Sequence, residues 1–191
     1  MTLRTAEISR AAVDMLRARL SELAGRTEFP RRALTRASPE DVSLAAGHDV
    51  YQLTLEQLAA GAGLEAAAVV GQRFLVLDRD RAIASAELFG AGADSVVATE
   101  GPFVLGTVEA IEAAEADPQL ADGRYELRLL RVPAIALVAL WLEDDDGGPG
   151  AVAPLRPVPP PLEAGRRYAP AEIMPLLATM ARERLRFDDR P

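Results

Sequence analysis

Apolar and polar positions change period along the chain, and the clearest change comes near its last third. Residues 125–129 alternate between apolar and charged side chains, the period of a strand with one buried face. Residues 132–142 then continue for eleven positions without a polar side chain, whereas a helix that crosses a bilayer needs about 20. We therefore expect a half-covered strand, a break at Pro133, and a strand covered on both faces.

A two-residue period also marks the middle of the chain. Residues 68–77 and 82–89 read as strands separated by the polar turn 78–80, which predicts a β-hairpin. A short strand is expected over 95–99, and another over 151–155 after the turn 147–150. The sequence thus predicts about six strands, most of them antiparallel neighbours.

Helical spacing is found before, between and after these strands. An amphipathic helix is expected over 5–26, and a serine followed by proline and two acids predicts a short helix from Ser38 to Gly47. Thr54 and Gln57 have the spacing of a capping box, which predicts a further short helix. Helices are also expected over 107–116 and 170–185, the second after a proline-rich spacer.

The order of these elements predicts an α+β fold. We expect a mostly antiparallel sheet of about six strands, with the helices 107–116 and 170–185 against one of its faces. Residues 1–60 would form an N-terminal helical segment, and residues 61–191 the α+β domain.

Composition excludes several classes of function. The chain of 191 residues has no cysteine, so disulfides, cysteine-bound metals and thiol nucleophiles are excluded. It also has no lysine, which excludes the P-loop of nucleotidases. All 21 basic residues are arginine and asparagine is missing as well, a bias that a GC-rich genome explains without any function. We expect no metal and no cofactor, no membrane segment, and a cytoplasmic location.

Charge is distributed unevenly. Residues 1–37 hold eight arginines and four acids, a net charge of +4, and the remaining 13 arginines and 25 acids give −12. An acidic body argues against nucleic-acid binding. The basic segment favours contact with an acidic surface on the body itself, on a second copy or on another protein. The arginines expected to make this contact are Arg17, Arg19, Arg31, Arg32 and Arg36.

No catalytic residue stands out, although a few side chains qualify as ligand-binding candidates. His48 is the single histidine and lies beside Asp49, but no nucleophile motif accompanies it, so a surface or capping role is preferred. Arg73 and Arg128 lie within expected strands, where an arginine either anchors an anion or pairs with a carboxylate across the sheet. The acidic run 143–146 is interpreted as a solvated turn, since it lacks the spacing of a calcium loop.

Arg131 adds a geometric constraint, because it follows Arg128 by three positions. In a regular strand two such residues occupy opposite faces, so one of them lies on the better-covered face unless a bulge intervenes. Residues 127–131 of the expected sheet therefore carry charge toward both of its sides.

Two functions remain open from the sequence. The first is a non-enzymatic interaction or accessory protein that self-associates, as a homodimer for example, or binds an acidic protein surface. The second is a small-molecule pocket between sheet and helix, catalytic or not, whose polar groups would be His48, Arg73 or Arg128.

Overall fold

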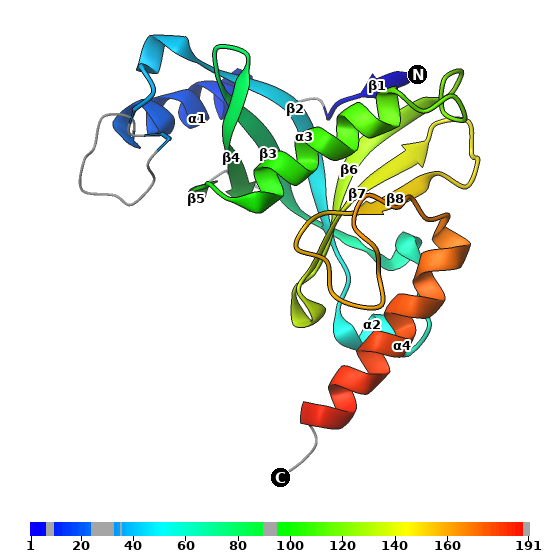
Figure 1. Ribbon diagram of the computed structural model, residues 1–191. Helices are drawn as coiled ribbons and strands as arrows, with labels where there is room; N and C mark the ends of the chain where they lie inside the picture. Colours follow the sequence, from blue (N-terminus) through cyan, green and yellow to red (C-terminus); the bar gives the residue numbers. More distant parts are fainter. Residues whose placement is uncertain (7–9, 24–32, 35, 90–94, 189–191) are drawn as a thin grey trace.

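The computed structural model describes residues 1–6, 10–23, 33–34, 36–89 and 95–188 (Figure 1). The strands are β1 (Thr2–Arg4), β2 (Val42–Gln52), β3 (Ala68–Asp78), β4 (Arg81–Phe89), β5 (Ser95–Thr99), β6 (Arg124–Val132), β7 (Leu137–Asp144) and β8 (Ala151–Pro154). The α-helices are α1 (Arg10–Leu23), α2 (Leu55–Ala59), α3 (Pro102–Glu115) and α4 (Pro170–Asp188). The predicted α+β class is confirmed.

All eight strands belong to one sheet, in the order β5-β4-β3-β2-β6-β7-β8. Neighbouring strands are antiparallel except at β6, which pairs in parallel with β2 through residues 49–52 and with β1 through residues 2–4. The two short ladders occupy consecutive parts of β6, residues 124–126 with β1 and residues 128–131 with β2. The sheet therefore has two antiparallel parts that meet at β6.

Strands β6 and β7 are both covered on two faces, as predicted for the apolar run, whereas β6 was expected to have only one buried face. On one face Leu127, Leu129 and Leu140 pack with residues of α3, and this side is called the α3 face. On the other, Leu130 and Trp141 pack with residues of α2 and α4, and this side is called the α4 face. The expectation that both long helices lie on one face is wrong, because the continuous apolar run leaves two surfaces of β6 and β7 to cover.

A separate part of the core lies over β3, β4 and β5. Leu20 of α1 and Leu34 are nearly inaccessible and pack against Phe74, Val76 and Ala84. Of the residues predicted on the apolar side of the first helix, Leu20 is buried and Met15 is 41% exposed, and the described helix is Arg10–Leu23.

The structure differs from the sequence prediction most in residues 1–60. Residues 38–47 were expected to be helical, but only one 3₁₀ turn forms, over Pro39–Asp41, before the long strand β2 begins at Val42. Ser38 makes no side-chain bond to the backbone of that turn, so the cap that would start an α-helix is missing. Strands β1 and β2 were not predicted, and they raise the number of strands from about six to eight.

The local signals around β3 and α2 are confirmed. Residues 71–78 of β3 pair with β4 in the predicted hairpin. Thr54 and Gln57 form the predicted capping box, in which each side chain bonds to the other residue's backbone N–H. Among the described residues, no helix is both long enough and apolar enough to cross a membrane.

Candidate functional site

The structure separates the three predicted ligand-binding residues into two groups. His48 and Arg73 are direct partners in the β2–β3 ladder and are almost fully buried. Arg128 pairs with Asp49 and Trp141 and lies on the α4 face. Arg131 lies on the opposite face from Arg128, as the three-residue spacing in a regular strand predicts. Each face of β6 therefore has its own polar site.

The site on the α4 face is an open groove of about 420 Å³. It lies between β6 and β7, the first turns of α4 and the residues around Leu64, and it is called the α4 groove. Its volume is within the range of about 300–1,000 Å³ that small-molecule sites occupy. Its apolar lining comes from Leu64, Trp141, Pro149, Pro170 and Met174, and its charged lining from Glu65, Arg128 and Glu143.

Arg128 is held against two aromatic rings beside this groove. Its guanidinium carbon lies 4.9 Å from the ring centroid of Tyr51 and 4.7 Å from that of Trp141. The two rings meet edge to face with their centroids 5.0 Å apart. Cation–π contacts of this kind fix the plane of the guanidinium and leave its edges free for carboxylates.

Carboxylates occupy those edges. Glu126 accepts hydrogen bonds from Nε and Nη2 of Arg128 at 3.1 and 2.6 Å, and Glu143 lies 3.6 Å from Nη1. Glu126 also pairs with Arg4 at 3.3 Å, and Arg4 in turn donates to Asp145. The hydrogen bond from Arg4 lowers the pKa of Asp145. The positive charge of Arg128 is thus offset within the protein, and the groove as a whole is acidic.

Trp141 provides the unsatisfied group of the α4 groove. The residue is 3% exposed, and its indole Nε1 is buried without a hydrogen-bond partner among the described residues. A buried N–H group with no acceptor costs about 1–3 kcal/mol. The sequence did not single out Trp141, because the residue lies inside the apolar run 132–142 and reads there as core. The one signal in the sequence that marked Trp141 was that it is the only tryptophan of the chain.

The site on the α3 face depends on a bulge in β2. Two residues, Ala46 and Gly47, stand opposite one residue of β3, and Ala46 adopts φ +48°. In a regular ladder Gly47 would face Arg73, and His48 would lie on the other side of the sheet. The extra residue instead places His48 beside Arg73. His48 is therefore a strand residue, not the helix-end residue that the sequence suggested.

Four polar side chains meet on the α3 face and are called the buried cluster: His48, Arg73, Glu87 and Arg131. Arg73 faces His48 on one side and Glu87 on the other in the strand ladders. The Glu87 carboxylate lies 3.6 Å from Arg73 Nε and also accepts a hydrogen bond from Arg131. Arg73 thus lies beside a carboxylate across the sheet, and this pair is buried and not solvated.

Burial dominates the electrostatics of this cluster. It lowers the pKa of His48 to about 4, with the charges of Arg73 and Arg131 acting in the same direction. It also lowers the pKa of Arg73 to about 10, against the opposing effect of Glu87. His48 Nδ1 lies 2.6 Å from the carbonyl oxygen of Ala46. At neutral pH the imidazole is therefore uncharged and donates from Nδ1.

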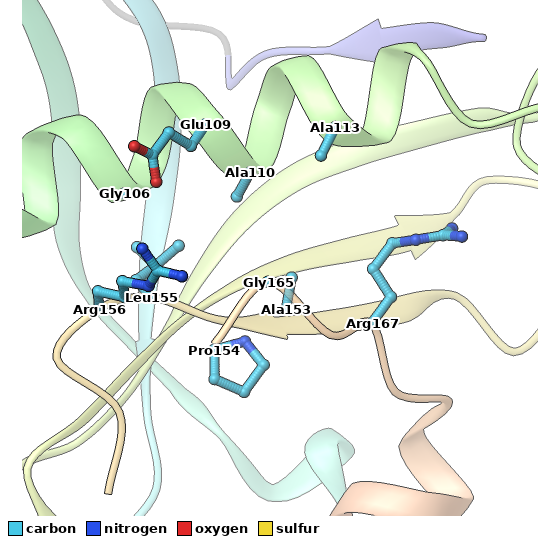
Figure 2. Close-up of a pocket in the computed structure, with 10 residues that line it drawn as sticks. All are labelled: Gly106, Glu109, Ala110, Ala113, Ala153, Pro154, Leu155, Arg156, Gly165 and Arg167. Carbon is cyan, nitrogen blue, oxygen red and sulfur yellow. The ribbon is translucent and has the colours of Figure 1, made fainter. Parts of the chain in front are cut away.

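A third concavity is a cavity of about 70 Å³ between α3 and β8. Figure 2 shows Ala110 and Ala113 of α3 on one side, Ala153 and Pro154 on the other, and Arg156 and Arg167 toward its two ends. Small side chains on the facing surfaces leave this space unfilled. The volume suits one or two water molecules, well below that of a typical ligand site.

The arginines predicted to contact a partner are only partly within the described residues. Arg17, Arg19 and Arg36 are exposed, and Arg19 pairs with Glu22 on its own helix. Arg31 and Arg32 lie outside the described residues. Contact of these arginines with an acidic partner stays a prediction.

The acidic run 143–146 takes part in ion pairs at the end of β7. Asp145 pairs with Arg4, and Asp146 pairs with Arg124 at 2.8 Å. In the described part of the chain, no group of histidine, aspartate and glutamate side chains has the arrangement of a metal site.

Comparison with protein-family models, with curated proteins and with solved structures finds no match, so the function is argued from the two sites alone.

Proposed function

We propose that this protein is a non-enzymatic binding protein that holds a small molecule in the α4 groove. The observation that carries the proposal is the buried indole N–H of Trp141, which has no acceptor among the described residues and lines a groove of about 420 Å³. A ligand that supplies a carbonyl or other acceptor would satisfy this donor and recover its desolvation cost.

The lining of the groove favours a ligand with an apolar body and a positive charge. Leu64, Met174 and the prolines provide apolar surface, and Glu65 and Glu143 provide negative charge. Arg128 attracts anions poorly, because Glu126 and Glu143 already surround its guanidinium. The ligand class that fits is therefore a cationic amine or amide with an apolar or aromatic group.

Intrinsic fluorescence tests this directly, since Trp141 is the only tryptophan. Phenylalanine amide carries a cation, a carbonyl and a ring, whereas N-acetylphenylalanine has the same ring and carbonyl with a negative charge. We expect the amide to shift or quench Trp141 emission with saturation, and the N-acetyl acid to bind at least about tenfold more weakly, or about 1.4 kcal/mol.

Two variants locate the binding. Glu143→Gln should weaken the response to phenylalanine amide, because it removes one charge from the groove. Arg81→Gln, at an exposed position outside the groove, is the matched surface control and should leave it unchanged. Equal responses to the cation and the anion, or no saturable response to either, would refute the proposal.

Association through the basic N-terminal segment is a second candidate function. Arg17 and Arg36 are exposed and form no ion pair with a described carboxylate. Met15, which lies on the same helix as Arg17, is 41% exposed. An exposed apolar side chain among unpaired arginines suits an acidic protein surface, on a second copy or another protein. Sedimentation at low and high salt tests it: a mass that falls from dimer to monomer supports self-association, and a constant monomer mass opposes it.

A further inference from the structure

Arg73 has an unusual environment for a buried arginine. It is 2% exposed, and its side-chain Nε is buried without a hydrogen-bond partner among the described residues, with the Glu87 carboxylate 3.6 Å away. A guanidinium N–H that is buried without an acceptor is costly. The Nε–H of Arg73 is therefore a donor for which an acceptor is expected.

The charge of the buried cluster leads to the same expectation. Among the described residues, Glu87 is the one carboxylate in contact with the cluster's two arginines, and it accepts a hydrogen bond from Arg131. Two positive charges and one negative charge leave a net +1 when His48 is neutral. Buried charges in proteins are normally paired. A single bound negative charge would balance the cluster.

His48 restricts which anion fits. Its Nδ1 donates to the carbonyl oxygen of Ala46, so in the neutral ring Nε2 is an acceptor, and this atom is buried without a partner. A simple anion such as chloride has no hydrogen to donate and would be repelled by the lone pair of Nε2. A ligand that offers an O–H group to Nε2 and anionic oxygens to Arg73 satisfies both residues.

We propose that the buried cluster binds a small planar oxyanion that carries one hydroxyl group, of which bicarbonate is the simplest example. Arg73 holds the two anionic oxygens side by side, as a guanidinium holds a carboxylate. His48 Nε2 accepts the hydrogen bond from the hydroxyl. Arg131, whose side chain is 23% exposed, lies at the solvent side of the cluster and provides the route of entry.

Thermal unfolding with matched anions tests this site. At about pH 8, where His48 is neutral, sodium bicarbonate, formate and chloride are compared at equal ionic strength. We expect bicarbonate to raise Tm above the chloride value by at least about 3 °C when the site is saturated. Formate, which has the planar oxygens without the hydroxyl, should fall between the two.

Variants separate the two contacts. Arg73→Met leaves Glu87 paired with Arg131 and should abolish the bicarbonate effect. His48→Phe keeps the ring and removes Nε2, so bicarbonate should fall to the level of formate. Arg81→Gln, at the exposed start of β4, should respond as wild type does.

Broadening of the ¹³C signal of labelled bicarbonate gives a second readout, which should disappear in Arg73→Met and does not depend on stability. The site has no contact with Trp141, so failure here leaves the α4 groove proposal standing.

Wild-type protein that responds alike to bicarbonate and chloride would show that water alone solvates the cluster. A bicarbonate response that persists in Arg73→Met would place binding elsewhere, and an unchanged preference over formate in His48→Phe would refute the role of the hydroxyl. Each of these results overturns the proposal.

Discussion

Protonation of His48 should make the stability of this protein depend on pH in a calculable way. Burial lowers the pKa of His48 from 6.5 to about 4 in the folded state. Since the unfolded chain takes up the proton first, the contribution to stability is complete above the unfolded pKa and is lost as pH falls toward the folded value. Between about pH 7 and about pH 5 the loss amounts to about 2 kcal/mol.

A matched variant isolates this contribution from the titration of the carboxylates. In His48→Asn the side-chain amide nitrogen stands where Nδ1 stands, so the bond to the Ala46 carbonyl is retained while the titrating group is removed. Carboxylate titration is common to both proteins and cancels in the comparison. The wild type should therefore lose about 2 kcal/mol more than the variant over this pH interval.

Urea unfolding at the two pH values, followed by the fluorescence of Trp141, measures both free energies. A wild-type and a variant protein that lose the same stability within about 0.5 kcal/mol would refute the reasoning. That result would mean that the imidazole reaches water in the folded state, in conflict with its complete burial.

Four further changes test the fold by the same urea assay. Thr54→Ala removes the capping box of α2 and should cost about 1 kcal/mol, whereas Ser38→Ala removes no cap and should cost under about 0.5. Gly71→Ala places a methyl group 2.3 Å from the carbonyl oxygen of Leu88, so the β3–β4 ladder must shift, and a cost below about 1 kcal/mol would contradict that contact. Leu140→Ala opens a cavity beneath α3 and should cost about 2–5 kcal/mol; a cost near zero would show that the α3 face is loosely packed.

Local sequence signals predicted the second part of the chain well. The hairpin around residues 78–80 and the α4 helix each have a period or a turn that acts within about ten residues. The apolar run 132–142 forms a strand only from Leu137, because Pro133–Ile135 form a 3₁₀ turn. These features depend on neighbours in the sequence, and so they are visible there.

Features that depend on distant residues were missed. Ser38 to Asp41 has the composition of a helix start, but β3 and β6 offer strand partners to the residues that follow, and pairing overrides the local preference. The placement of His48 depends on one extra residue in a bulge, which shifts it to the other face. The single tryptophan reads as core until the groove beside it is seen.

The parallel contact of β6 with β2 has a consequence for how the molecule assembles. Strands β2 to β5 form one up-and-down meander and β6 to β8 form another, and each consists of neighbours in sequence. Only four residue pairs join β2 to β6, across a separation of 79 positions between Asp49 and Arg128. Closing so long a loop is slow compared with forming hairpins. The β2–β6 pairing should therefore form last. Arg131 of the second meander can contact Glu87 of the first only after this pairing has formed.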